Sequence, residues 1–223
     1  GHPRDPHREI DGMSALRIAV RGSIDALDAR SCRVLFDRAT SSDSAVRERT
    51  SRIIARVRSE GDAALVALAH EFDGVEHATL EVTRTAWRAA LAALEPALRR
   101  ALERSAANIR QVHEAFRPVS SEITTVDGVI ICRRPDPLER VGVYAPGGRA
   151  TYPSSLLMGV IPARVAGVGE IIVCSPPGPD GLPSQVLLAA AELASADRVF
   201  AVGGAGAVAA MAFGTATIPA VDR

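Results

Sequence analysis

Two glycine-rich segments of this sequence have the composition of ligand-binding loops. The first covers residues 144–148 (YAPGG) and the second covers residues 203–209 (GGAGAVA). Glycine lets a ligand approach the backbone closely, and a helix that follows directs unpaired N–H groups at a phosphate or carboxylate. The segments therefore predict two loops that bind an anion or a nucleotide, although each is also typical of a tight turn between a strand and a helix. In that second interpretation Tyr144 packs at the edge of a sheet.

The second segment also fits the dinucleotide-binding fingerprint G-x-G-x-x-[G/A]. Gly204, Gly206 and Ala209 stand at the required spacing. Asp222 lies near the distance at which an acidic residue holds a ribose hydroxyl, but only Arg223 follows it, so a strand presenting this acid has no residues left for its sheet. The alternative is that the small residues let a helix pack closely on the sheet.

The sequence lacks the residues that several classes of enzyme need for catalysis. Lysine is absent and all 26 basic residues are arginines, which excludes a Schiff-base amine and a phosphate-loop lysine. The five histidines lie before residue 114, and no H-E-x-x-H pattern or G-x-S-x-G elbow occurs. Cys32, Cys132 and Cys174 are far apart and form no C-x-x-C pair, which predicts free thiols in a reducing, cytoplasmic compartment and no zinc site.

Charge and hydropathy argue against nucleic-acid and membrane partners. The 26 basic and 26 acidic residues give a net charge of zero, whereas a nucleic-acid surface needs clustered positive charge. Residues 199–221 carry no charge over a length that could span a bilayer, but several glycines and Pro219 interrupt them. Residues 1–12 are polar and charged, and we expect them to be an expression tag or a disordered leader.

The region before the first glycine loop is mainly helical by its periodicity. Apolar residues at helical spacing predict a helix that ends at Gly61, and Asp62 is expected to cap the next helix, over residues 63–72. A further apolar stripe runs from Trp87 to Phe116 and predicts one long helix. A short strand over residues 18–20 is expected ahead of these helices.

The period changes after residue 120. Apolar residues flank the Asp127-Gly128 pair, which is the strongest short hairpin signal. Beyond it, strands are predicted over residues 140–144, 170–174 and 198–202, and helices over residues 154–166, 183–194 and 205–213. Short connections through such helices imply parallel pairing, so the fold class is α/β, a helical N-terminal region followed by a Rossmann-like parallel sheet. The expected domains are the leader (1–12), a helical part (13–118) and the sheet domain (119–223).

The segment over residues 137–155 (PLERVGVYAPGGRATYPSS) closely resembles histidinol dehydrogenase. The resemblance covers nearly all of residues 16–223 in the order of that family. It continues at residues 57–65 (VRSEGDAAL), 72–74 (FDG), 107–110 (ANIR), 161–163 (IPA), 202–205 (VGGA) and 213–215 (FGT).

The resemblance implies an NAD-dependent, zinc-containing homodimer with an aldehyde-dehydrogenase-like architecture, which oxidises L-histidinol through L-histidinaldehyde to L-histidine. In that family the tyrosine of the Y-x-P-G-G loop contacts NAD, which carries over to Tyr144. A second NAD contact is the glutamine of a V-G-G-A-Q-A segment, and Gly206 stands at that position here. The side-chain amide is therefore lost, and the fingerprint match arises from this substitution.

Chains of the family are longer than this one. In them the glutamate and histidine that move protons, and the four zinc ligands, belong to a part that follows the position of Arg223. The resemblance therefore places no catalytic and no metal-binding residue in this chain, and we expect the N-terminal half of such an enzyme, inactive alone. The alternative is a naturally short, non-catalytic homologue that binds a nucleotide or a protein partner, which Gly206 favours.

Overall fold

The structure is a computed structural model that describes residues 23–36, 44–76, 79–125, 128–147 and 150–223. The chain divides into two compact units, Gly1–Val46 and Arg47–Arg223. The first unit contains a 3₁₀ turn, Ile24–Ala26, and helix α1, Ala29–Phe36. The expected leader and the expected strand over residues 18–20 lie outside the described residues.

Helices α2, Ser44–Glu60, and α3, Asp62–Asp73, confirm two predicted helices. Gly74 ends α3 in the left-handed conformation, with a φ of 68°, which glycine adopts without strain. The predicted role of Asp62 is wrong, because Gly61 occupies the capping position and Asp62 is the first helical residue. The Asp62 carboxylate instead accepts a hydrogen bond from the Thr217 hydroxyl at 2.6 Å, and so ties α3 to a distant loop.

The single helix predicted between Trp87 and Phe116 is two helices, α4, Arg84–Ala92, and α5, Pro96–Ala115. Proline disfavours helical backbone in the residue before it, and Glu95 is accordingly extended, with a ψ of 132°. The Glu95 carboxylate then caps α5 by accepting hydrogen bonds from the first backbone N–H groups of the helix. The apolar period continues through this break, so periodicity alone does not reveal it.

The predicted hairpin is confirmed. Strands β1, Ser121–Thr124, and β2, Ile130–Arg133, pair antiparallel, with Ile123 opposite Ile131. All eight strand residues are exposed to solvent.

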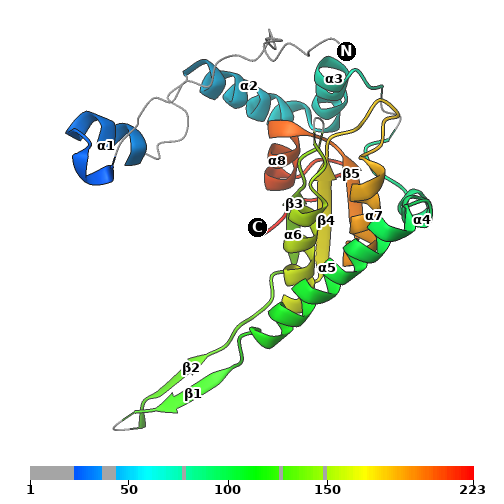
Figure 1. The fold of residues 1–223 in the computed structure, drawn as a ribbon. Coiled ribbons are helices and arrows are strands. Elements are labelled where there is room, and N and C mark those ends of the chain that lie inside the picture. The colour runs from blue at the N-terminus through cyan, green and yellow to red at the C-terminus, as the bar shows by residue number, and fades with distance from the viewer. Residues whose placement is uncertain (1–22, 37–43, 77–78, 126–127, 148–149) are drawn as a thin grey trace, which may run out of the picture. The chain divides into compact units, whose positions relative to one another are not determined.

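A parallel sheet follows, in the order β3-β4-β5, and confirms the predicted α/β class (Figure 1). Helices connect and follow its strands as predicted. The elements in chain order are β3, Arg140–Tyr144; α6, Pro153–Ala166; β4, Glu170–Ser175; α7, Gln185–Ala194; β5, Arg198–Ala201; and α8, Gly204–Phe213.

Helices cover both faces of this sheet, because its central strand β4 is apolar at successive positions. Ile171 and Val173 face a core that α4, α5, α6 and α7 complete. Ile172 and Cys174 face the opposite core, which α2, α3 and α8 complete. Buried side chains therefore hold α3 and α8 on the same face of the sheet.

Two extended segments lie along the outer strands, and the sequence did not predict either of them. Residues 80–82 run beside β5, where Val82 N–H donates to Val199 O and Ala201 N–H donates to Leu80 O. At the other edge, Asp222 and Arg223 hydrogen-bond to the backbone of β3. The uncharged residues 199–221 form β5, α8 and loops, and no helix in the described part of the chain has the length and apolar composition to span a bilayer.

Candidate nucleotide-binding site

The two glycine loops meet at the carboxyl end of the parallel sheet. The Tyr144 hydroxyl accepts a hydrogen bond of 3.1 Å from the backbone N–H of Gly204. Tyr144 ends β3, and Gly204 begins α8 just after β5, so this hydrogen bond joins the loops that follow the two outer strands of the sheet. Ligands of open parallel sheets bind beyond the carboxyl ends of the strands, which makes this the candidate site.

Pro176 lies between the two loops and explains why both contain glycine. A Cβ atom on Gly203 would stand 2.6 Å from Pro176 Cβ, and a Cβ atom on Gly147 would stand 3.0 Å from Pro176 Cγ. Both distances are shorter than ordinary carbon contacts. Pro176 was not among the predicted site residues, because its only signal in the sequence is its place directly after a buried strand.

The first turn of α8 receives its acceptor from another part of the chain. Gly203, at the capping position, has no side chain to offer, and Gly204 has a φ of 61° that favours glycine. The Tyr144 hydroxyl therefore satisfies one of the N–H groups that every helix leaves unpaired at its start. Tyr144 consequently holds the two loops together and does not simply pack at the edge of the sheet.

Gly206 is buried and faces α3. A Cβ atom on Gly206 would stand 3.2 Å from Leu68 Cδ1 and 3.5 Å from Leu65 Cδ2. The small residue at position 206 therefore permits the close approach of α3 to α8. Other small residues of α8, Ala207 and Ala210, pack on the sheet in the same core, as the alternative interpretation predicts. Tyr144 and Gly206, the two predicted site residues, lie at the same end of the sheet.

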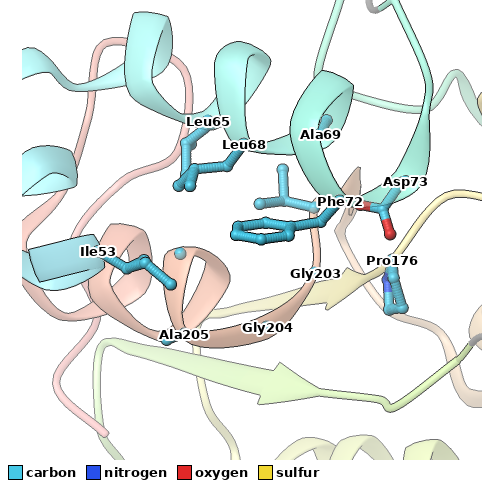
Figure 2. A pocket seen from close by; sticks show the side chains of 12 residues that line it. Ile53, Leu65, Leu68, Ala69, Phe72, Asp73, Pro176, Gly203, Gly204 and Ala205 are labelled. Atoms are coloured by element: carbon cyan, nitrogen blue, oxygen red, sulfur yellow. The ribbon is translucent and has the colours of Figure 1, made fainter. Parts of the chain in front are cut away.

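A cavity of about 170 Å³ opens between α3 and the start of α8 (Figure 2). Figure 2 shows the Phe72 ring between α3 and the backbone of Gly203 and Gly204. The Arg49 guanidinium lies 5.0 Å from the centre of this ring. Apolar side chains and glycines provide most of the wall, which is formed by Ile53, Leu65, Leu68, Ala69, Phe72, Asp73, Pro176, Val202, Gly203, Gly204, Ala205 and Gly206.

Asp222 lies at the wrong end of the sheet to hold a ribose. Its carboxylate accepts a hydrogen bond of 2.9 Å from the backbone N–H of Arg140, the first residue of β3. The glycine loops follow the last residues of the strands, so the whole length of β3 separates Asp222 from them. The fingerprint interpretation of Gly204, Gly206 and Ala209 therefore lacks its acidic partner.

Side chains suited to proton transfer or metal binding do not gather at this site. Within the described ranges, no three His, Cys, Asp or Glu side chains lie close enough to hold one ion. Cys174, at the end of β4, is fully buried, and this burial raises the pKa of its thiol to about 12. A thiol with that pKa stays protonated near neutral pH, and a protonated thiol is a poor nucleophile.

The amino end of the sheet carries charge instead. Arg198 forms two hydrogen bonds with the Glu81 carboxylate, at 2.8 and 2.6 Å, and donates a third to Thr217 O. These bonds hold the pKa of Glu81 below its ordinary value. Arg140 pairs with Glu170 in the same region. These ion pairs tie strands and edge segments together at the end remote from the glycine loops.

Sequence comparison relates this chain to one known family. The sequence profile of histidinol dehydrogenase matches residues 36–223. A histidinol dehydrogenase from Burkholderia pseudomallei (strain 1710b) is 47% identical over 190 residues, which are 82% of this chain and 42% of the relative. One from Cupriavidus pinatubonensis is 43% identical over 222 residues, which are 96% of this chain and 49% of the relative.

A solved structure gives the same result. The crystal structure of histidinol dehydrogenase from Elizabethkingia anophelis superposes with a TM-score of 0.79 at 30% sequence identity, and covers 88% of this chain and 45% of that protein. The chain thus spans about half the length of the relatives it matches. By its profile match and its similarity to these relatives, the chain belongs to the histidinol dehydrogenase family.

Proposed function

We propose that this chain supplies part of the NAD cleft of a histidinol dehydrogenase, which oxidises L-histidinol through L-histidinaldehyde to L-histidine. The observation that carries the proposal is the hydrogen bond between Tyr144 and Gly204, which joins the two glycine loops where an open sheet binds ligands. Membership of the family supplies the reaction and the substrate.

The residues of the site fit a dinucleotide in three respects. The glycine backbone after β5 allows close approach, the amino terminus of α8 favours a negatively charged group, and the apolar cavity beside it can bury a ring. NAD, when bound, accepts the hydride that leaves the alcohol. Tyr144 would orient the cofactor through its hydroxyl and ring, and the residues at the start of α8 would hold its phosphates.

Zinc and the homodimeric state enter the proposal through the family alone, and a cytoplasmic location through the family and the unpaired cysteines. Since the described residues contain no cluster of metal-ligating side chains, we assign no zinc ligand to them. The proton-transfer groups are likewise assigned to no residue here. We therefore expect the isolated chain not to oxidise L-histidinol.

Calorimetry with NAD tests the cofactor site. We expect weak binding to the unmodified chain, loss of binding in Tyr144→Ala, and no change in the control Tyr152→Ala, which alters the second tyrosine of the chain. Tight binding that survives Tyr144→Ala contradicts the assignment. Formation of NADH from L-histidinol by the chain alone, with NAD and zinc supplied, contradicts the expected lack of activity.

A second candidate function is a non-catalytic homologue that binds a nucleotide or a protein partner. Gly206 favours it, because the residue that the resemblance associates with an NAD contact has lost its side chain. The coding DNA beyond the codon for Arg223 separates the two candidates. A continuation in frame into the remainder of the family's sequence supports the dehydrogenase, and a stop codon supports the short homologue.

A further inference from the structure

A groove between α2 and α3 carries an excess of positive charge. Its volume is about 290 Å³, which is ample for a phosphate group. Its charged lining consists of Arg49, Arg52 and Arg56 from α2 and Glu71 from α3. The chain as a whole has a net charge of zero, so this groove is a local concentration of positive charge, which attracts anions.

The three arginines lie on one side of α2. Arg49 and Arg52 are three residues apart, and Arg52 and Arg56 are four apart, so the helix places them on successive turns of the same face. Like charges at this spacing repel one another and lower the stability of a helix. An anion in the groove relieves this repulsion, because it attracts all three guanidinium groups.

Arg49 and Arg52 have guanidinium groups that are available to an anion. Arg52 is exposed and has no hydrogen-bond or ion-pair partner among the residues that the structure describes. The guanidinium of Arg49 lies 5.0 Å from the centre of the Phe72 ring. A guanidinium that stacks on a ring keeps its N–H groups at its edge, where they can donate to phosphate oxygens.

Arg56 offsets the negative charge beside the groove. Its Nε atom lies 3.2 Å from a carboxylate oxygen of Glu60, and its Nη1 atom lies 3.8 Å from one of Glu71. Arg49 and Arg52 therefore keep their charge free for a ligand. The planar fork of arginine binds two oxygens of a phosphate group at once, and these charge-assisted hydrogen bonds are among the stronger ones in proteins.

The groove adjoins the cavity at the glycine loops. Ile53, Leu68 and Phe72, which Figure 2 labels, line both the groove and the cavity. The Phe72 ring is in contact with Arg49. A nucleotide bound at the glycine loops that carries a further phosphate can therefore reach the arginines past this ring.

We propose that Arg49 and Arg52 form a binding site for a phosphate group in the groove between α2 and α3. This site is separate from the start of α8, to which the proposed function assigns the phosphates of NAD. Two sources offer the same chemistry, a nucleotide with an additional phosphate on its ribose, such as NADP, and a free phosphate compound. The inference rests on the proposed function for the first source only.

Calorimetry with inorganic phosphate at constant ionic strength tests the site. We expect the unmodified chain to bind phosphate and Arg52→Gln to bind it roughly threefold to tenfold more weakly, because an exposed charge-assisted hydrogen bond is lost. The matched control is Arg58→Gln, which removes the same charge from the same helix. Arg58 lies over the Phe213 ring and does not line the groove, so this variant should bind phosphate like the unmodified chain.

Titration with NAD and NADP identifies the source of the phosphate. If NADP binds the unmodified chain more tightly than NAD, and Arg52→Gln removes the difference, the groove receives a nucleotide phosphate. If inorganic phosphate binding depends on Arg52 while NAD and NADP bind equally or not at all, the groove receives a free phosphate compound.

Two results overturn the proposal. The first is that the unmodified chain does not bind inorganic phosphate and does not prefer NADP to NAD. The second is that Arg52→Gln binds phosphate and NADP as tightly as the unmodified chain, or no more weakly than Arg58→Gln does.

The same titrations distinguish this inference from the proposed function. If NAD binding is lost in Tyr144→Ala, but no phosphate binds and NADP is not preferred, the cofactor site stands and the arginine site is refuted. If phosphate binding depends on Arg52 in a chain that does not bind NAD, the arginine site stands and the cofactor assignment is refuted.

Discussion

The two ends of the parallel sheet are built from different kinds of residue. At the amino end each strand begins with a charged residue, Arg140, Glu170 or Arg198, and ion pairs join neighbouring strands. At the carboxyl end the strands continue into glycines and a proline, and one phenol hydroxyl joins the loops. Between these two ends, residues 171–174 of the central strand β4 are apolar and buried.

The amino end of the sheet contributes to the stability of the fold, whereas the carboxyl end is also suited to bind a ligand. Ion pairs at the amino end fix the strands through side chains. Glycines at the carboxyl end let loops approach one another closely and keep backbone accessible to a ligand. We therefore expect substitutions at the amino end to change stability alone, and substitutions at the carboxyl end to change ligand binding as well.

The largest effect is expected from Gly203→Ala at the carboxyl end. The new methyl group would lie 2.6 Å from Pro176 Cβ, so one loop must move, and we expect the free energy of unfolding to fall by about 1–3 kcal/mol. Urea denaturation followed by the fluorescence of the single tryptophan, Trp87, measures it. NAD binding should weaken in the same variant.

Gly169→Ala is the matched control at the amino end. Its methyl group would lie 3.0 Å from Glu139 O, a milder contact, so we expect a smaller loss of stability and no change in NAD binding. If Gly203→Ala and Gly169→Ala weaken NAD binding equally, the carboxyl end of the sheet has no special role in binding.

The next effect is expected from Tyr144→Phe, which removes only the hydroxyl that joins the loops. The Gly204 N–H loses its acceptor, which should lower the free energy of unfolding by about 0.5–1 kcal/mol and weaken NAD binding. Tyr152→Phe serves as the control in the same denaturation and calorimetry experiments. If Tyr144→Phe binds NAD as well as the unmodified chain, the hydroxyl has no role in the site.

A smaller effect is expected from Glu81→Gln at the amino end. Arg198 lowers the pKa of Glu81, so the ion pair stabilises the fold above the ordinary pKa of 4.5, and this stabilisation is lost as the pH falls through the lowered pKa. Because the Glu81 side chain is 40% exposed, solvent screening limits the contribution to under about 1 kcal/mol at pH 7.

Urea denaturation of the unmodified chain and of Glu81→Gln between pH 7 and pH 3 measures the contribution of the ion pair between Glu81 and Arg198. The difference in the free energy of unfolding between the unmodified chain and Glu81→Gln should shrink toward zero in acid. NAD binding at pH 7 should be the same in both. A difference that grows as the pH falls contradicts the assignment, as does a change in NAD affinity.

The smallest effect is expected when a thiol reagent is added to Cys174 in the native protein. The loops at the carboxyl end are accessible to solvent, but Cys174 on β4 beneath them is fully buried. This burial raises the pKa of the Cys174 thiol to about 12. In a Cys32→Ser background, only Cys132 on the exposed hairpin should react at pH 8, and Cys174 should react after unfolding in urea. Rapid labelling of Cys174 in the folded chain would mean that the core under the site is open to solvent.

Local sequence signals predicted the strands and the helices between them, with small differences at their ends. An apolar run with glycine after it identifies β3, β4 and β5 because burial and turn geometry act over a few residues. The break before Pro96 was missed because the apolar period runs on through Leu94, which is itself buried. The segments beside β3 and β5 were missed because their hydrogen-bond partners are remote in sequence.

The candidate site was predicted only in part. The glycine loops and Tyr144 carry recognisable motifs, so the sequence indicated both halves of the site. No signal assigned Phe72, Leu68 or Pro176 to the site. A leucine in an amphipathic helix is typical of any core, Phe72 only carries part of the family resemblance, and Pro176 only follows a buried strand. Their part in the cavity depends on how α3 lies against α8.

The sequence by itself determined the family of this chain, the order of its elements and the position of its glycine loops, since these depend on local pattern and backbone freedom. Only the tertiary structure decided that the Tyr144 hydroxyl binds Gly204, that Asp222 lies at the opposite end of β3, and that Gly206 faces Leu68. The physical reason is that each of these contacts joins residues far apart in the chain, and packing of helices on the sheet sets their distances.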